Sequence, residues 1–461
     1  MDPAKVTKNR RCIGFATGVI LLLLGPAAGA DDLIFDLEEV SACELFEQIP
    51  TFALGQQATC TRRPDPNVRA YPALKSDKPV YGSVQFGSYD EARNPALLYH
   101  FVADESGGSG TGYDRLYLDL NGDKDLSNDT PVLPKNDWPA QLRLRYTSIE
   151  RDVLFDRLGI PLPFGPAGRR PLEVVPRLLL LKGGSAMLSF VPTKARRGHI
   201  EIAGRQYDVF LGQTQPVCGW FDHPETSFHL VPRTGSSVQS TSTTMTTLMW
   251  MRRLGETFYR FAATPAGDKL FVRPYDGPLG DFEIGGPKFQ TTALTAGGHL
   301  QSRDTIIPVN GPKCRLPVGD YSLAYLTVAH QGLTFAIQQN IHGDGAFRGK
   351  LYHQPAYPIP IREGTCFVLD FSHSPQIVFA CPSRDHRARV GENLFVEAVL
   401  ADPALDFVVC NLSYTPPQPA AGPAEPPAHT RAQTRNTTLP PQVTISRANG
   451  EVVARGVMGY G

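Results

Sequence analysis

The residues of this chain whose types and spacing could do chemistry are oxygen-bearing side chains gathered in one short stretch. They occupy every second position after Leu118, with one further carboxylate downstream: Asp119, Asn121, Asp123, Asp125 and Asp129. Calcium takes six to eight oxygen ligands and tolerates irregular geometry, and a 12-residue calcium loop supplies side chains from positions 1, 3 and 5. With Asp119 as position 1, the spacing predicts a Ca²⁺ site with these five residues as ligands.

The match to a regular calcium loop is incomplete. Lys124 stands at position 6 where glycine is usual, Thr130 occupies position 12, and the closing carboxylate comes one residue early at Asp129. Leu126 stands at position 8, where such loops place an apolar anchor. The preceding run 116–120 is typical of a strand, so we expect a structural calcium loop between β-elements. The alternative is a solvated acidic turn, because Asn and Asp favour turns in any case.

Composition predicts a mainly β, multi-domain protein with few short helices. Gly and Pro make 84 of the 461 residues, about 18% against a usual ~12%, which favours many turns. We expect short antiparallel strands and four segments, bounded as follows: a signal peptide at 1–30, a β-rich domain with the acidic loop at 31–195, a second β-rich domain at 196–280, and β-sandwich domain or domains at 281–461 with a Pro-rich insertion at 415–442.

Residues 1–30 have the pattern of a secretory signal peptide. Basic residues precede an apolar run at 13–24, and Ala28-Gly-Ala30 is typical of a cleavage site. We expect a secreted or periplasmic protein with no membrane span after cleavage. The mature chain would carry 41 basic and 44 acidic residues, so nucleic acid is not an expected partner.

Two hairpins are predicted from turn residues. The run 198–211 reads as two strands joined at Ala203-Gly204, and 443–457 as two strands joined through Asn449-Gly450. Tyr207-Asp208 repeats the Tyr-Asp pair that precedes the acidic loop, which suggests a degenerate repeat whose loop keeps only Asp222. Short, evenly spaced strands after residue 281 predict an immunoglobulin-like β-sandwich.

Seven cysteines remain after position 30, an odd number. Export permits disulfides. Cys366 and Cys381 are the best pair if 365–371 and 376–381 form a hairpin, and Cys43 with Cys60 is a weaker pair. Buried free thiols are the alternative, since a register slip of one residue separates the hairpin pair.

Other candidate chemistry is sparse. The chain contains no G-x-S-x-G, H-E-x-x-H, phosphate-binding glycine loop or Cys-x-x-Cys. His342, Asp344 and His353 are ligand types for zinc, but glycine neighbours favour a turn. Asp222-His223 beside Trp220 could form a small site, and a turn before Pro224 is the simpler interpretation.

Three stretches carry a resemblance to known proteins: 113–129, with its strand followed by D-x-N-x-D-x-D-L, 394–406 and 443–458. They resemble a group of uncharacterised exported bacterial proteins with a sandwich-like C-terminal end. The resemblance covers most of the mature chain and implies no activity or substrate.

Two functions of different classes remain open on the sequence. The first is a secreted non-catalytic protein, calcium-stabilised, that binds a protein or glycan partner. The alternative is a secreted hydrolase whose site is assembled from distant residues. A deep cleft with two carboxylates would favour the hydrolase, and a flat face with exposed aromatic side chains would favour the binding protein.

Overall fold

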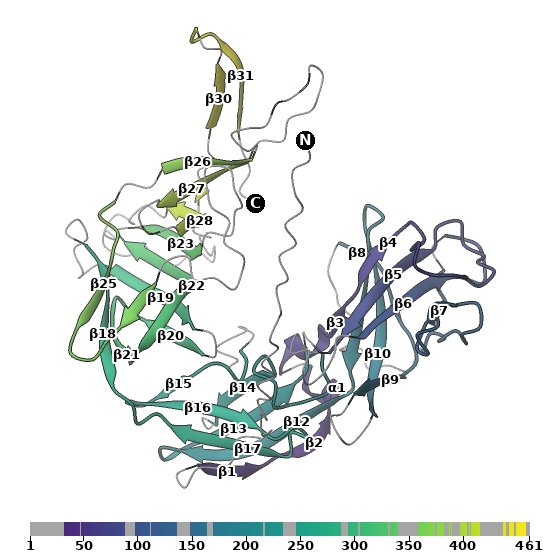
Figure 1. The fold of residues 1–461 in the computed structure, drawn as a ribbon, viewed down its shortest axis with the longest axis horizontal. Coiled ribbons are helices and arrows are strands. Elements are labelled where there is room, and N and C mark those ends of the chain that lie inside the picture. Colours follow the sequence, from purple (N-terminus) through teal and green to yellow (C-terminus); the bar gives the residue numbers. More distant parts are fainter. Residues whose placement is uncertain are drawn as a thin grey trace, which may run out of the picture.

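The structure is a computed structural model, and it describes only part of the 461-residue chain. The described residues are 32–46, 48–87, 97–110, 112–135, 148–163, 169–214, 217–233, 246–286, 294–302, 305–330, 332–339, 358–373, 376–381, 387, 389, 397–402, 405, 407–414, 437–438, 442–446 and 449–457. The predicted signal peptide lies outside these residues, and of the Pro-rich insertion at 415–442 only 437, 438 and 442 are described. Figure 1 shows the strands arranged in an arc, with the N-terminal unit at one end and the C-terminal unit at the other.

The central unit of the arc is a sandwich of two four-stranded antiparallel sheets. One sheet has the order β1-β17-β16-β15, with the strands β1 (Leu33–Asp36), β15 (Arg252–Leu254), β16 (Thr257–Ala263) and β17 (Lys269–Pro274). The other has the order β14-β13-β12-β2, with the strands β2 (Glu38–Ser41), β12 (Lys194–Ile202), β13 (Arg205–Gly212) and β14 (Ser227–Pro232). Alternate residues of both sheets, among them Val209, Phe228 and Val272, point inward and form one core.

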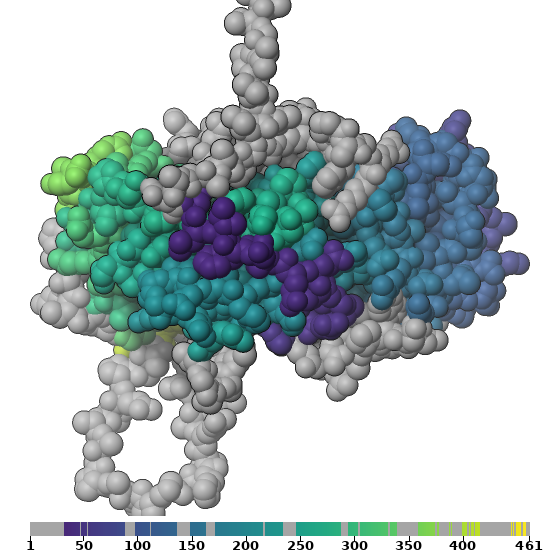
Figure 2. Space-filling view, turned by 90° about the horizontal axis from the view of Figure 1, so that it is seen from below, coloured from purple at the N-terminus to yellow at the C-terminus, as the bar shows by residue number. Residues whose placement is uncertain are grey.

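The N-terminal strands belong to this central sandwich. β1 pairs with β17, and β2 pairs with β12, more than 150 residues later in the chain. Figure 2 shows these residues, in purple, at the surface of the central unit. Glu38 pairs with Arg197 at 2.6 Å across the β2–β12 contact, and Asp36 pairs with Lys269 at 2.8 Å across β1–β17. Exposed pairs of this kind add little stability but favour one register.

The unit at the N-terminal end is a second sandwich. One sheet has the order β3-β11-β10-β8, with β9 also on β10, and its strands are β3 (Gln56–Gln57), β8 (Ile149–Leu154), β9 (Leu158–Pro163), β10 (Arg169–Leu181) and β11 (Ala186–Pro192). The other has the order β4-β5-β6-β7, with β4 (Thr59–Thr61), β5 (Val80–Phe86), β6 (Leu97–Asp104) and β7 (Arg115–Leu118). Phe86, Phe101 and Phe190 are fully buried in the core between the two sheets.

Two short helical turns connect these two sandwiches. α1 (Ala42–Leu45) follows β2 directly, and the 3-10 turn η1 (Pro50–Ala53) comes a few residues later. Leu45 is 1% exposed and packs in a small core with Val175 and Val191 of the N-terminal sandwich and Phe210 of the central one. Both turns are four residues long, which fits the expectation of few, short helices. Neither turn is long enough to cross a bilayer, nor is any other helix in the described part of the chain.

The C-terminal unit contains a nine-stranded sheet and a three-stranded sheet. The large sheet has the order β20-β19-β22-β23-β28-β27-β26, with two short strands beside it, and consists of β19 (Leu294–Gln301), β20 (Ile306–Asn310), β22 (Gly319–His330), β23 (Leu333–Gln339), β24 (Ile359–Ile361), β26 (Gln376–Cys381), β27 (Glu397–Asp402), β28 (Phe407–Tyr414) and β29 (Thr437–Thr438). The small sheet has the order β21-β18-β25, with β18 (Leu279–Gly285), β21 (Lys313–Pro317) and β25 (Cys366–Asp370). β30 (Gln442–Ser446) and β31 (Val452–Val457) form a separate hairpin.

The predicted mainly β, multi-domain class with several short antiparallel sheets is confirmed. The hairpin at Ala203-Gly204 is also confirmed: Ile202 pairs with Arg205, and the two turn residues have φ of 51° and 70°. The hairpin that closes at Gly450 is confirmed by the β30–β31 pairing. The immunoglobulin-like character of the C-terminal unit stays a prediction.

The predicted disulfide between Cys366 and Cys381 is wrong, because the two strands do not form a hairpin. β25 pairs in parallel with β18, and β26 pairs with β27 in the other sheet. Cys366 is a free, exposed thiol, and Cys43 and Cys60 are also free. The weaker pair, Cys43 with Cys60, is therefore not formed either.

Candidate functional site

The predicted calcium loop begins directly after β7 and is fastened to the face of sheet β4-β5-β6-β7 that lies away from the sandwich core. Leu126 is fully buried and packs with Tyr81, Val102 and Tyr117, whose neighbours in sequence point into the core on the other face. The Leu126 N–H donates to the Ala70 carbonyl at 2.9 Å. The anchoring role predicted for Leu126 is confirmed, so the loop is held in place by packing as well as by hydrogen bonds.

Asp119 organises the first half of the loop from a buried position. The residue is 2% exposed, and its Oδ1 accepts the N–H groups of Gly122 and Asp123 at 2.8 and 3.1 Å. Its Oδ2 accepts the Lys124 N–H at 2.9 Å. Lys124 has φ of 63°, a left-handed conformation that costs a non-glycine residue about 1 kcal/mol. Lys124 therefore adopts the left-handed backbone conformation that glycine adopts at position 6 of a regular calcium loop.

The next side chains each bond to the backbone two residues further on. Asn121 Oδ1 accepts the Asp123 N–H at 2.8 Å, Asp123 Oδ1 accepts the Asp125 N–H at 2.8 Å, and Asp125 Oδ1 accepts the Ser127 N–H at 3.0 Å. These bonds turn the side-chain oxygens at alternate positions toward the loop. A carboxylate has about four lone-pair sites, so one such bond leaves capacity for a cation.

Asp129 is the least satisfied carboxylate of the loop. Burial, followed by the negative charges of Asp119, Asp123 and Asp125, raises the pKa of Asp129 to about 6. Its Oδ2 is buried and has no hydrogen-bond partner among the described residues. By contrast, hydrogen bonds led by that from Asn128 lower the pKa of Asp123. Negative charge therefore accumulates around a buried oxygen that has no hydrogen-bond partner among the described residues.

The five loop residues approach one another but do not form a closed ligand cage. Within the part of the chain that the structure describes, no group of three or more His, Cys, Asp or Glu side chains is close enough to hold a metal ion. Calcium binding here therefore requires side chains of the loop to move closer together than they are in this structure.

A second candidate site, which sequence reasoning missed, is a cleft of about 420 Å³ between the N-terminal and central sandwiches. We call it the charged cleft. Its charged side chains come from β2, β10, β12 and the turn before β9, and they are Glu39, Arg157, Glu173, Lys194 and Arg196. Its apolar wall includes Leu158, Leu162, Leu172 and Phe221.

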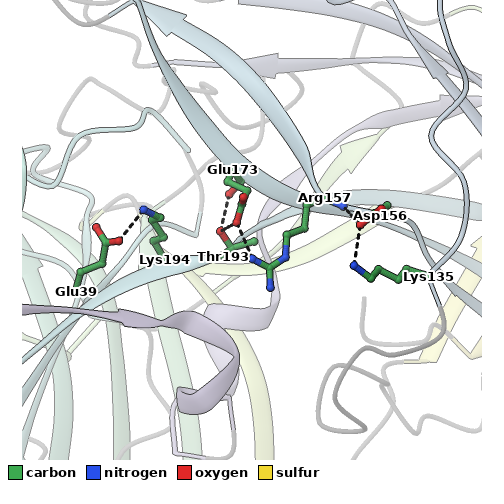
Figure 3. A network of polar contacts seen from close by, with 7 residues as sticks. All are labelled: Glu39, Lys135, Asp156, Arg157, Glu173, Thr193 and Lys194. Carbon is green, nitrogen blue, oxygen red and sulfur yellow. Dashed lines mark hydrogen bonds and ion pairs between the residues drawn. The ribbon is translucent and has the colours of Figure 1, made fainter.

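Both carboxylates of the charged cleft are held by basic side chains, as Figure 3 shows in part. Glu39 Oε1 forms an ion pair with Lys194 at 2.6 Å, and its Oε2 forms one with Arg196 at 3.1 Å. Glu173 Oε1 forms an ion pair with the Arg157 guanidinium at 3.1 Å. Thr193 Oγ1 also donates to Glu173 Oε1, at 2.8 Å. The cleft is thus lined by ion pairs and by apolar side chains.

The one thiol among the described residues that line the charged cleft, Cys218, is buried. Cys218 is 2% exposed, and burial raises the pKa of its thiol to about 11. Its Sγ donates to the Trp220 carbonyl at 3.4 Å. Because the thiolate is the nucleophilic form, Cys218 is unsuited to covalent catalysis near neutral pH.

The remaining sequence candidates add no further site within the residues that the structure describes. His342, Asp344 and His353 lie outside the described residues. His223 lies in a turn: its carbonyl accepts the Thr226 N–H at 2.9 Å, and its Nδ1 accepts the Glu225 N–H at 3.2 Å. The turn interpretation of Asp222-His223 is therefore favoured. The degenerate repeat proposed for 207–224 stays a prediction.

Comparisons with known proteins do not assign this chain to a family. No protein-family model, no curated protein and no solved structure matches it. The resemblance to exported bacterial proteins stays a prediction, and the function has to be argued from the loop and the cleft.

Proposed function

We propose that this chain is an exported, non-catalytic β-rich protein that holds a structural calcium ion in the loop 119–129 and binds a protein or glycan partner. The observation that carries the calcium site is the buried, unpartnered Oδ2 of Asp129, near three other carboxylates that raise its pKa. Burial of unneutralised charge is costly. A divalent cation at this point would turn mutual repulsion into attraction.

The residues of the loop suit calcium better than magnesium or zinc. All five are oxygen donors, which exclude a typical zinc site. Several of their oxygens already accept backbone N–H groups, so the coordination would be irregular and incomplete until water joins it. Calcium tolerates such geometry, whereas magnesium demands a near-ideal octahedron. Bound calcium would hold the loop against the sheet at the end opposite to Leu126.

The non-catalytic part of the proposal is supported by the charged cleft. Two carboxylates in one cleft are what the alternative, a hydrolase, requires. General acid–base catalysis, however, needs a carboxyl group within hydrogen-bond reach of the proton that it transfers. Glu39 and Glu173 already contact basic side chains, so their oxygens are engaged in ion pairs. The arrangement suits binding better than proton transfer.

Isothermal titration calorimetry of metal-free protein with Ca²⁺ and Mg²⁺ tests the calcium site. We expect one Ca²⁺ per chain and at least tenfold weaker Mg²⁺ binding. The Asp129→Asn variant should bind Ca²⁺ at least tenfold more weakly, because one charged ligand is lost. The control is Glu150→Gln, which removes an exposed carboxylate outside the loop. Absence of Ca²⁺ binding, or equal binding by Asp129→Asn, would contradict the proposal.

A further inference from the structure

Arg196 in the charged cleft is the starting point, because it is a buried cation with an unmade hydrogen bond. The residue is 9% exposed, and its guanidinium lies 5.5 Å from the ring centroid of Phe221. One Nη bonds Glu39, but the Nε–H is buried and finds no acceptor in the described chain. A buried donor without a partner is costly, so an oxygen atom supplied by a ligand would stabilise this arrangement.

The charge of the cleft favours an anion. Three basic side chains, Arg157, Lys194 and Arg196, line it together with only two carboxylates, Glu39 and Glu173. One positive charge is therefore left over among the lining residues, and a monovalent anion would balance it. Asp268 is not among the lining residues; the hydrogen bond from Thr264 at 2.5 Å and, to a smaller extent, the positive charge of Arg196 lower the pKa of its carboxyl group.

The walls of the cleft require more of the ligand than charge. Its volume of about 420 Å³ lies within the range of about 300–1,000 Å³ that is typical of small-molecule sites. Apolar side chains, Leu162 and Phe221 among them, also line it. An inorganic anion would leave these side chains in contact with water, whereas an organic acid would cover them.

We propose that the charged cleft binds a small organic monocarboxylate that has an apolar body. The carboxylate accepts the Arg196 Nε–H and balances the one positive charge left over among the lining residues. The apolar body packs against Phe221 and the leucine side chains. Guanidinium suits this role because its N–H groups match the geometry of a carboxylate. The inference is independent of the calcium loop, since the two sites share no residue.

The test is isothermal titration calorimetry of the full chain with phenylacetate, hexanoate and D-glucuronate. Phenylacetamide serves as the uncharged counterpart of phenylacetate, and sodium chloride and sulfate serve as inorganic anions. We expect at least one carboxylate with an apolar body to bind, and phenylacetamide to bind at least tenfold more weakly than phenylacetate. Arg196→Gln should weaken carboxylate binding tenfold or more, since a hydrogen bond to a charged group is lost.

The matched control is Arg197→Gln, the next residue on β12, which pairs with Glu38 outside the cleft. Binding to this variant should be unchanged. Gly159→Val tests the volume without touching a charge: a Cβ at this position of the cleft wall would lie 3.7 Å from Pro171 Cβ, an ordinary contact. We expect it to fold and to lose binding, which decides the question even if Arg196→Gln is unstable.

Three results would overturn the proposal. One is that none of the carboxylates binds at about 10 mM, a concentration at which even weak specific binding is detected. Another is that phenylacetamide or sulfate binds as tightly as phenylacetate. The third is that Arg197→Gln loses carboxylate binding as Gly159→Val does, or that Gly159→Val binds the carboxylate as tightly as wild type.

Discussion

Replacing Asp129 by Asn should stabilise the calcium-free protein near neutral pH, although it removes a charged residue from a folded loop. Burial and three neighbouring carboxylates raise the pKa of Asp129 to about 6 from an ordinary 3.8. That difference corresponds to about 3 kcal/mol of unfavourable interaction of the ionised form. Because Asp129 is partly exposed and solvent screens the charges, we expect a gain of about 1 kcal/mol in the free energy of unfolding.

The pH dependence has a definite sign. The folded-state pKa of Asp129 is raised, so the folded protein binds the proton more tightly than the unfolded chain does. The stabilising contribution of the protonated carboxyl is complete below pH ~4 and is lost as the pH rises through about 6. Calcium reverses the trend, because it competes with the proton for the same carboxylate.

The assay is urea unfolding in the presence of a chelator at pH 4.5 and 7.5. We expect wild type and Asp129→Asn to differ by about 1 kcal/mol at pH 7.5 and by less at pH 4.5. Glu150→Gln, a change at an exposed carboxylate, should have no effect at either pH. If Asp129→Asn is less stable than wild type at pH 7.5 in chelator, the carboxylate makes a favourable interaction in the metal-free protein, and our account of the loop is wrong.

Three further predictions concern stability, and urea unfolding measures each of them. Burial alone would raise the pKa of Glu105, but hydrogen bonds from Ser109 and from the N–H groups of Gly110 and Gly112 lower it to about 2. The free energy of unfolding should therefore fall as the pH drops from 4.5 through about 2. Glu105→Gln should cost about 2 kcal/mol at pH 7 and should make this pH dependence flatter. Arg177 is 1% exposed and pairs with Asp152 through two hydrogen bonds of 3.0 and 2.6 Å; Asp152→Ala alone should cost about 3–5 kcal/mol and the double change with Arg177→Met less, so an additive double variant would contradict this. Ala203→Asn should stabilise by about 1 kcal/mol, because Ala203 has φ of 51° and Asn-Gly is the preferred pair for this turn; a loss of stability would contradict it.

The parts of the structure that the sequence predicts are those that depend on neighbours in the chain. The hairpin at Ala203-Gly204 follows from residues that accept positive φ in a two-residue turn. The burial of Leu126 follows from its position in the loop pattern. The Asp119 bonds to the Gly122 and Lys124 N–H groups are likewise local, since they span at most five residues.

The parts that the sequence could not predict depend on pairings between distant strands. Cys366 is separated from Cys381 because β25 pairs in parallel with β18, which lies 85 residues earlier in the chain. The charged cleft has the same origin: Glu39 meets Lys194 only because β2 pairs with β12. Neither residue has a local signal that distinguishes it from any exposed charge. Charged residues at alternate positions, such as Lys194 and Arg196, are common on the exposed faces of sheets and therefore do not indicate a cleft.

Thermal unfolding with calcium and with chelator tests the central claim, that the loop 119–129 holds a structural calcium ion, most directly. The measurement compares wild type with the double variant Asp123→Asn, Asp125→Asn, which leaves the buried Asp119 in place. At calcium about 100-fold above the dissociation constant, binding to the folded state alone adds about 2.7 kcal/mol. We predict that calcium raises the wild-type melting temperature by several degrees and leaves the double variant unchanged. A wild-type melting temperature that does not respond to calcium would show that the loop is only a solvated acidic turn.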